Sequence, residues 1–229
     1  MYYPKRFFGG KIPTDYVLAY DFNNSLLDKS VNSNHGSVVG NLSFVNAVDS
    51  LGKRLQSIYF DLATFVRTTN NVDLSSTDKI SLAFWFKSSF RYTAVVIEQS
   101  TYPYGFVVAN SNQMLDTIEI SDLQSGYNVA YSSSFNPSED VWKFIVMTID
   151  RSKSGLSQNT IYVNAVNSTT LHNSLRADNN GAFSAARLTI GARDFENKPA
   201  YPIRGYMAKL KCYPRILSPR EISLLFGEA

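Results

Sequence analysis

The feature that most constrains the fold is a long series of short segments rich in β-branched and aromatic residues, separated by turn-forming clusters. The clearest segment is KISLAFWFK at residues 79–87. Alternation along a strand would place four apolar side chains on one of its faces, those of Ile80, Leu82, Phe84 and Phe86. Trp85 would lie on the other face, so we expect both faces of this strand to be covered.

Further strands are expected throughout the chain. Their ranges are residues 15–22, 37–45, 57–61, 65–68, 93–98, 104–109, 116–120, 127–132, 142–150, 160–166, 187–192 and 205–213. Helical periodicity is nearly absent before Ser218, which excludes a parallel sheet built from alternating strands and helices. The series therefore predicts an all-β sandwich or barrel.

The last segment predicts a strand followed by a short helix. Alternation over residues 205–213 indicates a half-solvated strand, and Pro214 would end it by removing a backbone donor. Ser218 and Glu221 then have the spacing of a capping box, with a proline at the first helical position between them. We expect Gly227 to end the helix in the left-handed conformation. None of these residues suits catalysis, so the segment indicates an architectural closure.

Composition bounds the organisation of the chain. With 229 residues, 44% of them hydrophobic, the chain can bury a large core as one domain. No linker or internal repeat interrupts it. We therefore expect an extended N-terminal arm at residues 1–13 and one sandwich domain at residues 14–229.

Charge and cysteine content exclude several kinds of protein. The net charge is only +3 and the basic residues are scattered, which argues against a nucleic-acid partner. No apolar run is long enough to enter a bilayer, and no hydrophobic stretch follows Lys5 and Arg6, so we expect synthesis in the cytoplasm without a signal peptide. The single cysteine, Cys212, excludes an intrachain disulfide.

The order of these segments resembles a known family. The motifs are YDF at 20–22, NHG at 34–36, IYFD at 58–61, ISLAFWFK at 80–87, WKFIVMTID at 142–150, IYVN at 161–164, LTIG at 188–191 and the closing stretch from Gly205 to Ile222. Together they look like a laminin G-like domain of the concanavalin A-like lectin/glucanase superfamily, over about residues 15–226. The resemblance implies a two-sheet antiparallel jelly roll with a short C-terminal helix.

Glycoside hydrolases of the same superfamily carry carboxylates at alternate positions of one strand. Here Asp116, Glu119 and Asp122 are spaced by three, which sends successive carboxylates to opposite faces. The two histidines, His35 and His172, are far apart and have no nucleophile motif beside them. We therefore expect no catalytic residues and no enzyme. A weak glycosidase that uses Glu119 is kept as an alternative.

No cofactor is expected. Many family members have an acidic pair where this chain has Ala208 and Lys209, which argues against an inherited calcium site. Asp28, Asn32 and Asn34 offer oxygen atoms to a hard cation, but the same residues commonly form turns. We expect the turn, in which Gly36 can adopt a positive φ, and no metal ligands.

Loops that combine aromatic and polar residues are the candidates for ligand binding, because sugars present apolar faces and hydroxyl groups together. The preferred candidates are Tyr102, Tyr104, Arg193, Asp194, Phe195 and Asn197, with the loop at residues 90–92 as a further one. Packing of the tyrosines on the rim of the sandwich is the alternative.

The N-terminal arm is the second candidate surface. Its four aromatic residues would be a liability if exposed on a free tail, and together with an arginine they could anchor the arm: Tyr2, Tyr3, Arg6, Phe7 and Phe8. The arm either folds back or docks on an assembly partner. Stand-alone domains of this family resemble those of phage virions, which implies docking on capsid or fibre subunits and display on a virion surface. We expect a virion decoration or adhesion protein. A free-standing soluble lectin is the alternative.

Overall fold

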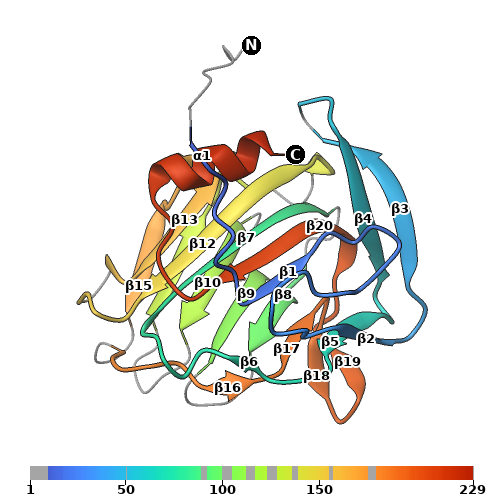
Figure 1. The fold of residues 1–229 in the computed structure, drawn as a ribbon, viewed down its shortest axis with the longest axis horizontal. Helices are drawn as coiled ribbons and strands as arrows, with labels where there is room; N and C mark the ends of the chain where they lie inside the picture. The colour runs from blue at the N-terminus through green and yellow to red at the C-terminus, as the bar shows by residue number, and fades with distance from the viewer. Residues whose placement is uncertain are drawn as a thin grey trace.

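The computed structural model describes residues 10–49, 51–88, 92–99, 105–111, 117–122, 128–135, 139–154, 157–174 and 179–228. In these residues, two antiparallel eight-stranded sheets pack face to face, with a single helix at the C-terminal end (Figure 1). This arrangement confirms the predicted jelly-roll sandwich.

The first sheet contains the first and the last strand of the described chain. Its strand order is β14 (Val166–Asn167), β13 (Asn159–Val163), β12 (Lys143–Asp150), β7 (Lys79–Ser88), β20 (Arg204–Tyr213), β4 (Arg54–Asp61) and β3 (Ser43–Val48), and β1 (Leu18–Tyr20) also pairs with β20. Strands from the beginning, middle and end of the chain are thus neighbours, as a jelly roll requires.

The second sheet has the order β15 (Leu171–Ser174), β11 (Asn128–Ser132), β10 (Thr117–Asp122), β9 (Phe106–Ser111), β8 (Ala94–Gln99), β17 (Leu188–Ile190), β5 (Phe65–Thr68) and β2 (Gly36–Val39). Two short pairs lie beside it: β6 (Val72–Asp73) with β16 (Ala185–Ala186), and β18 (Arg193–Phe195) with β19 (Lys198–Ala200).

The main core lies between the sheets, and a second apolar cluster lies on the outer face of the first sheet. Strand β7 contributes to both. Its inward side chains are Ile80, Leu82, Phe84 and Phe86, as predicted. Trp85 faces outward and stacks on Phe226 of the helix α1 (Pro219–Gly227), with ring centroids 5.7 Å apart. The helix therefore covers the outer face, and the expectation that both faces of this strand are buried is confirmed.

Strand β20 differs from the sequence prediction. A bulge at Lys209, whose φ is +49°, shifts the register, so that Met207 and Leu210 both face the main core. Simple alternation would have put these two residues on opposite faces. The strand is also not half-solvated, because α1 and the chain before β1 cover its outer side, where Tyr213 is fully buried.

The helix start is confirmed, whereas two glycine predictions are wrong. Ser218 Oγ accepts a hydrogen bond from Glu221 N, and the Glu221 carboxylate accepts one from Ser218 N at 2.8 Å. Gly227 belongs to the helix, and the C-cap is Glu228 with an ordinary φ of −72°. Gly36 does not have the positive φ expected of a turn. It starts β2, where a Cβ atom would lie 2.9 Å from side chains of Leu26 and Val66.

The end of the predicted arm lies against the sandwich. Ile12 packs on the outer apolar cluster, and the Tyr213 hydroxyl donates to the carbonyl oxygen of Pro13 at 3.3 Å. Residues 1–9, and with them the predicted docking aromatics, lie outside the described residues. Within the described ranges, no helix is long and apolar enough to cross a membrane.

Candidate functional site

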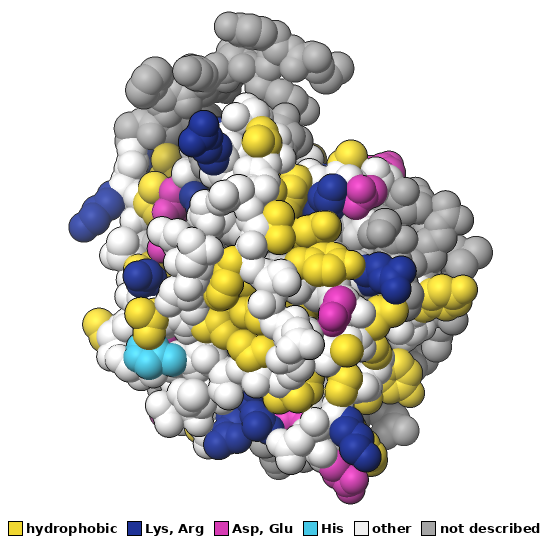
Figure 2. Space-filling view, turned by 90° about the vertical axis from the view of Figure 1, so that its right-hand side faces the viewer, with side chains coloured by type: hydrophobic (Ala, Val, Ile, Leu, Met, Phe, Trp, Pro, Cys, Tyr) yellow, Lys and Arg dark blue, Asp and Glu magenta, His cyan; other side chains and the backbone are white. Residues whose placement is uncertain are grey.

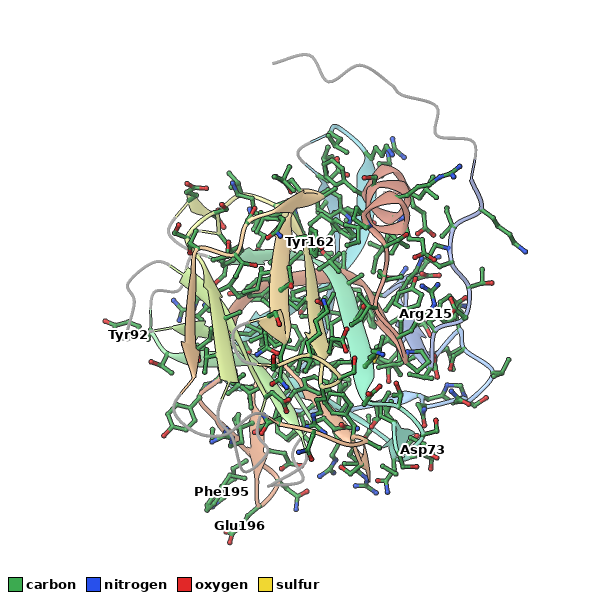
Figure 3. All side chains as sticks on the ribbon, turned by 90° about the vertical axis from the view of Figure 1, so that its left-hand side faces the viewer. Asp73, Tyr92, Tyr162, Phe195, Glu196 and Arg215 are labelled. Atoms are coloured by element: carbon green, nitrogen blue, oxygen red, sulfur yellow. The ribbon has the colours of Figure 1, made fainter. Side chains whose placement is uncertain are left out.

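The β18–β19 hairpin protrudes at the end of the molecule opposite α1 (Figure 1). Phe195 and Glu196 lie at its tip and point away from the body of the protein (Figure 3), and the residue Phe195 is 61% exposed. Glu196 and Asn197 have φ values of 52° and 62°, the left-handed pair that a two-residue hairpin turn requires. The turn therefore presents an aromatic ring to solvent.

Arg67 on β5 anchors this hairpin. Its Nη1 donates to Asp194 Oδ2 at 2.6 Å and to Asn197 Oδ1 at 2.8 Å. The backbone N–H of Asn197 donates to Asp194 Oδ1 at 2.9 Å. Asp194 and Asn197, which the sequence suggested as ligand-binding residues, thus hold the hairpin in place. The sequence analysis missed Arg67, because it lies far away along the chain.

Arg193 also has a partner within the protein. Its Nε lies 3.0 Å from both carboxylate oxygens of Glu98 on β8, and Glu98 is only 2% exposed. The guanidinium group also lies 5.7 Å from the centre of the Tyr201 ring. Arg193 therefore neutralises a buried carboxylate, a role that its position in an exposed hairpin did not suggest.

A cavity of about 280 Å³ lies beside the hairpin. Its polar lining comes from Arg67, Asn71, Arg187, Thr189 and Asp194. Arg187 is exposed and makes no hydrogen bond or ion pair with the described part of the chain. The structure thus combines an exposed ring with a polar cavity that has a free guanidinium group.

Several other predicted positions cannot be placed. Tyr102 and Tyr104 lie outside the described residues, as do Tyr2, Tyr3, Arg6, Phe7 and Phe8. In the loop at residues 90–92 only Tyr92 is described, where it is 68% exposed and points outward (Figure 3). These assignments stay predictions.

The carboxylates of β10 do not converge. Asp122 is fully buried, and its two oxygens accept from Arg151 Nη2 at 2.6 Å and Nε at 2.9 Å. Ile118 and Ile120 face the main core from the same side of the strand, so Glu119 faces the outer side, as its spacing predicted. Asp116 lies outside the described residues. A catalytic pair of Glu119 and Asp122 is therefore absent from the described part of β10.

The Asp28 carboxylate is occupied by its own turn. Oδ1 accepts from Ala19 N at 2.8 Å and Ser30 N at 2.9 Å, and Oδ2 accepts from Asn34 N at 2.8 Å. Asn32 donates its side-chain amide to the carbonyl oxygen of Val17. No three His, Cys, Asp or Glu residues form a metal-binding group in the described part of the chain. The geometry of this segment is that of a turn.

Two other reactive residues, His35 and Cys212, are held in structural roles, whereas the side chain of His172 lies outside the described part of the chain. His35 Nδ1 accepts from the backbone N–H of Asp28 at 3.1 Å. Burial raises the pKa of the Cys212 thiol to about 12, so the thiolate that would act as a nucleophile does not form near neutral pH.

Sequence comparison identifies the family. A laminin G-type family model, described as the concanavalin A-like lectin/glucanases superfamily, matches residues 63–223. The chain belongs to this superfamily. The resemblance of the sequence motifs is thereby confirmed. Among curated proteins no relative matches the sequence.

Solved structures share the fold at low identity. Domain 4 of AbnA, an extracellular GH43 arabinanase of Geobacillus stearothermophilus, was solved with arabinotriose and matches with a TM-score of 0.68 and 17% identity, covering 92% of this chain and 98% of that domain. A botulinum neurotoxin type C structure, whose cell entry depends on two ganglioside molecules, matches with a TM-score of 0.68 and 13% identity over 95% of this chain. The botulinum neurotoxin serotype G binding domain matches with a TM-score of 0.64 and 13% identity over 93% of this chain. This chain spans about half of both neurotoxin chains, 52% and 51%.

Proposed function

We propose that this chain is a non-enzymatic glycan-binding module that binds sugar through the β18–β19 hairpin and the cavity beside it. The observation that carries the proposal is the exposed Phe195 ring, held by the ion pair of Arg67 with Asp194 next to a polar cavity. Because these contacts hold the hairpin in place, a ring at its tip can stack on the C–H face of a sugar without the hairpin having to order on binding.

The cavity supplies the polar half of such a site. Arg187 and Asn71 are both exposed on its lining and offer donors to sugar hydroxyl groups. Carbohydrate ligands also occur among the structural neighbours, in the arabinotriose complex and the ganglioside-dependent toxin. These neighbours support the class of ligand, and the residues that bind it here are our own assignment.

The absence of catalysis is part of the proposal. Its support is the pairing of Asp122 with Arg151 in the core and the outward direction of Glu119. A retaining glycosidase needs two carboxyl groups about 5 Å apart, one of them free to act as a nucleophile. Glu119→Gln is expected to leave any glycan affinity and any residual glycoside turnover unchanged, measured with an aryl glycoside panel.

We further propose that the protein is displayed on a virion surface, anchored by its N-terminal arm on a capsid or fibre subunit. The described end of the arm, residues 10–13, runs next to α1, and the hairpin protrudes at the opposite end of the sandwich (Figure 1). An anchor at one end and a binding surface at the other suit a decoration or adhesion protein.

Two experiments test the two parts separately. Calorimetric titration with arabinotriose, lactose and a sialylated ganglioside oligosaccharide should detect binding that Phe195→Ala weakens and Lys198→Ala does not. Lys198 is a matched control because it is exposed on the same hairpin.

Deletion of residues 1–9 should keep the fold and glycan affinity but abolish copurification with particles. A truncated protein that stays folded and still joins particles would exclude the docking role of the arm.

A further inference from the structure

A second, larger concavity lies on the outer face of the first sheet, between β3 and the residues just before β12. Its volume is about 490 Å³, within the roughly 300–1,000 Å³ of typical ligand pockets. The lining residues used below are Asp49, Lys87, Asp140, Trp142 and Tyr206. We call this concavity the β3 groove. Figure 2 shows the side of the molecule that carries β3 and β4, where hydrophobic side chains gather across the middle of the face with charged side chains around them.

Aromatic residues form one part of the β3 groove. Trp142 and Tyr206 both line it, and their ring centroids are 6.2 Å apart. Tyr59 supports Tyr206 from the neighbouring strand β4, with ring centroids 4.8 Å apart. The three rings come from three segments of the chain, and their mutual contacts fix the apolar surface of the groove before any ligand arrives.

Asp49 lines the groove and has one carboxylate oxygen without a hydrogen-bond donor. Its Oδ1 accepts from Leu51 N at 2.7 Å and Lys53 N at 2.8 Å, which closes the turn between β3 and β4. Its Oδ2 is buried and has no hydrogen-bond partner, although the whole residue is only 6% exposed. A buried carboxylate oxygen left unpaired is costly, so a ligand that donates a hydrogen bond to it gains affinity.

The charges in the groove indicate what kind of donor fits. Lys87 Nζ lies 3.2 Å from Asp140 Oδ2 and 5.4 Å from the centre of the Tyr206 ring, so this lysine is already neutralised. Because Lys87 and Asp140 neutralise each other, the Asp49 carboxylate is the remaining charge among the residues that line the groove. An anionic ligand would be repelled by it, whereas hydroxyl groups can donate to it.

We propose that the β3 groove is a second saccharide site, which takes a neutral sugar unit with a hydroxyl donating to Asp49 Oδ2 and a C–H face against Trp142 and Tyr206. The inference rests on the proposed function for the class of ligand, but it uses none of the hairpin residues. The protein would then hold glycans at two separate surfaces, and a glycan long enough to reach both would bind with higher avidity than either site alone provides.

The key variant is Asp49→Asn. Its amide oxygen can replace Oδ1 in the turn, while the amide nitrogen replaces the unpaired acceptor by a donor. The probes are arabinotriose, maltotriose, lactose and N-acetyllactosamine as neutral sugars, and 3′-sialyllactose as an acidic one. Binding is measured by calorimetry and by tryptophan fluorescence. Fluorescence reports on the groove because the only other tryptophan, Trp85, is fully buried.

We expect at least one neutral sugar to change the fluorescence, and Asp49→Asn to weaken that sugar's affinity by about tenfold, the loss expected for a hydrogen bond to a charged group. Trp142→Phe should weaken it by a smaller factor. Val166→Ala is the matched control outside the groove, since Val166 is 64% exposed on β14, at the opposite end of the first sheet from β3. This control should bind as the wild type does.

The pattern of outcomes separates this inference from the proposed function. Loss of binding in Asp49→Asn with retention in Phe195→Ala supports the groove and overturns the hairpin assignment. Loss in Phe195→Ala alone overturns the groove. Two binding events, each removed by one variant, support both sites. A folded protein that binds none of the five sugars overturns both.

Discussion

The hairpin and the β3 groove differ in which groups are exposed and which polar groups lack a partner. In the hairpin, Asp194, Asn197 and Arg193 all have partners within the protein, and the Phe195 ring is exposed. In the groove, Trp142 is only 7% exposed and the unpaired group is a carboxylate oxygen of Asp49. The polar residues of the exposed loop therefore serve the fold, whereas the unpaired acceptor that we propose for a ligand lies in the groove.

The largest expected effect comes from breaking the pairing under the hairpin. Arg193→Ala would leave the carboxylate of Glu98 buried without a counter-charge, and we expect the free energy of unfolding to fall by about 3 kcal/mol. Urea denaturation of both proteins measures this difference. Lys198→Ala should change it by less than about 0.5 kcal/mol. Equal stability of Arg193→Ala and wild type would mean that the arginine is free for ligands after all.

The next largest effect on stability concerns Asp49 Oδ1, the oxygen that accepts hydrogen bonds within the turn between β3 and β4. Asp49→Ala removes the acceptor for two backbone donors, those of Leu51 and Lys53, and should lower the free energy of unfolding by about 2 kcal/mol. Asp49→Asn keeps one acceptor and should stay within about 0.5 kcal/mol of the wild type. If both variants are equally destabilised, the two oxygens do not have the separate roles that the groove requires.

A smaller effect is expected at the tip of the hairpin. Phe195→Ala should leave stability within about 0.5 kcal/mol of the wild type, because the ring is mostly exposed. Sugar affinity at the hairpin should fall by roughly three- to tenfold, the loss of one aromatic contact worth about 1 kcal/mol. Unchanged affinity for every sugar that binds would remove Phe195 from the site.

The smallest effect concerns an exposed charge pair, which contrasts with the buried one of Arg193. The guanidinium group of Arg215 lowers the pKa of Glu221 from 4.5 to about 2. The ionised Glu221 carboxylate therefore stabilises the folded protein above about pH 4.5, and this contribution is lost as the pH falls toward 2. Because the pair is largely solvated, the loss should be below about 1 kcal/mol.

Denaturation curves of wild type and Glu221→Gln at several pH values measure this contribution. The stability difference between the two proteins should shrink as the pH drops through that window. A difference that grows with acidity would contradict the assigned pKa direction.

Local patterns predicted the elements that depend on neighbouring residues. Alternation gave strand β7 with both faces covered, and the spacing of Ser218 and Glu221 gave the helix start. The hairpin was found as an aromatic loop, since its turn and its ring are encoded within five residues. The bulge at Lys209 was missed because alternation alone does not reveal an extra residue in a strand.

Features that depend on distant segments could not be predicted. The partner of Arg193 is Glu98, on another strand of the fold, and Arg67 reaches the hairpin from β5. The β3 groove combines Asp49, Trp142 and Tyr206 from three separate parts of the chain. A single sequence holds no signal for such pairings. The tryptophan at the start of the segment 142–150 was noted only as part of a family motif.

A glycan-array screen of the full chain, run with calcium and again with a chelator, tests glycan binding itself. We predict specific glycan binding that the chelator leaves unchanged, because the Asp28 carboxylate already accepts hydrogen bonds from its own turn. A blank array with folded protein would contradict the glycan-binding function. Binding that the chelator abolishes would contradict the metal-independent sites proposed for the hairpin and the groove.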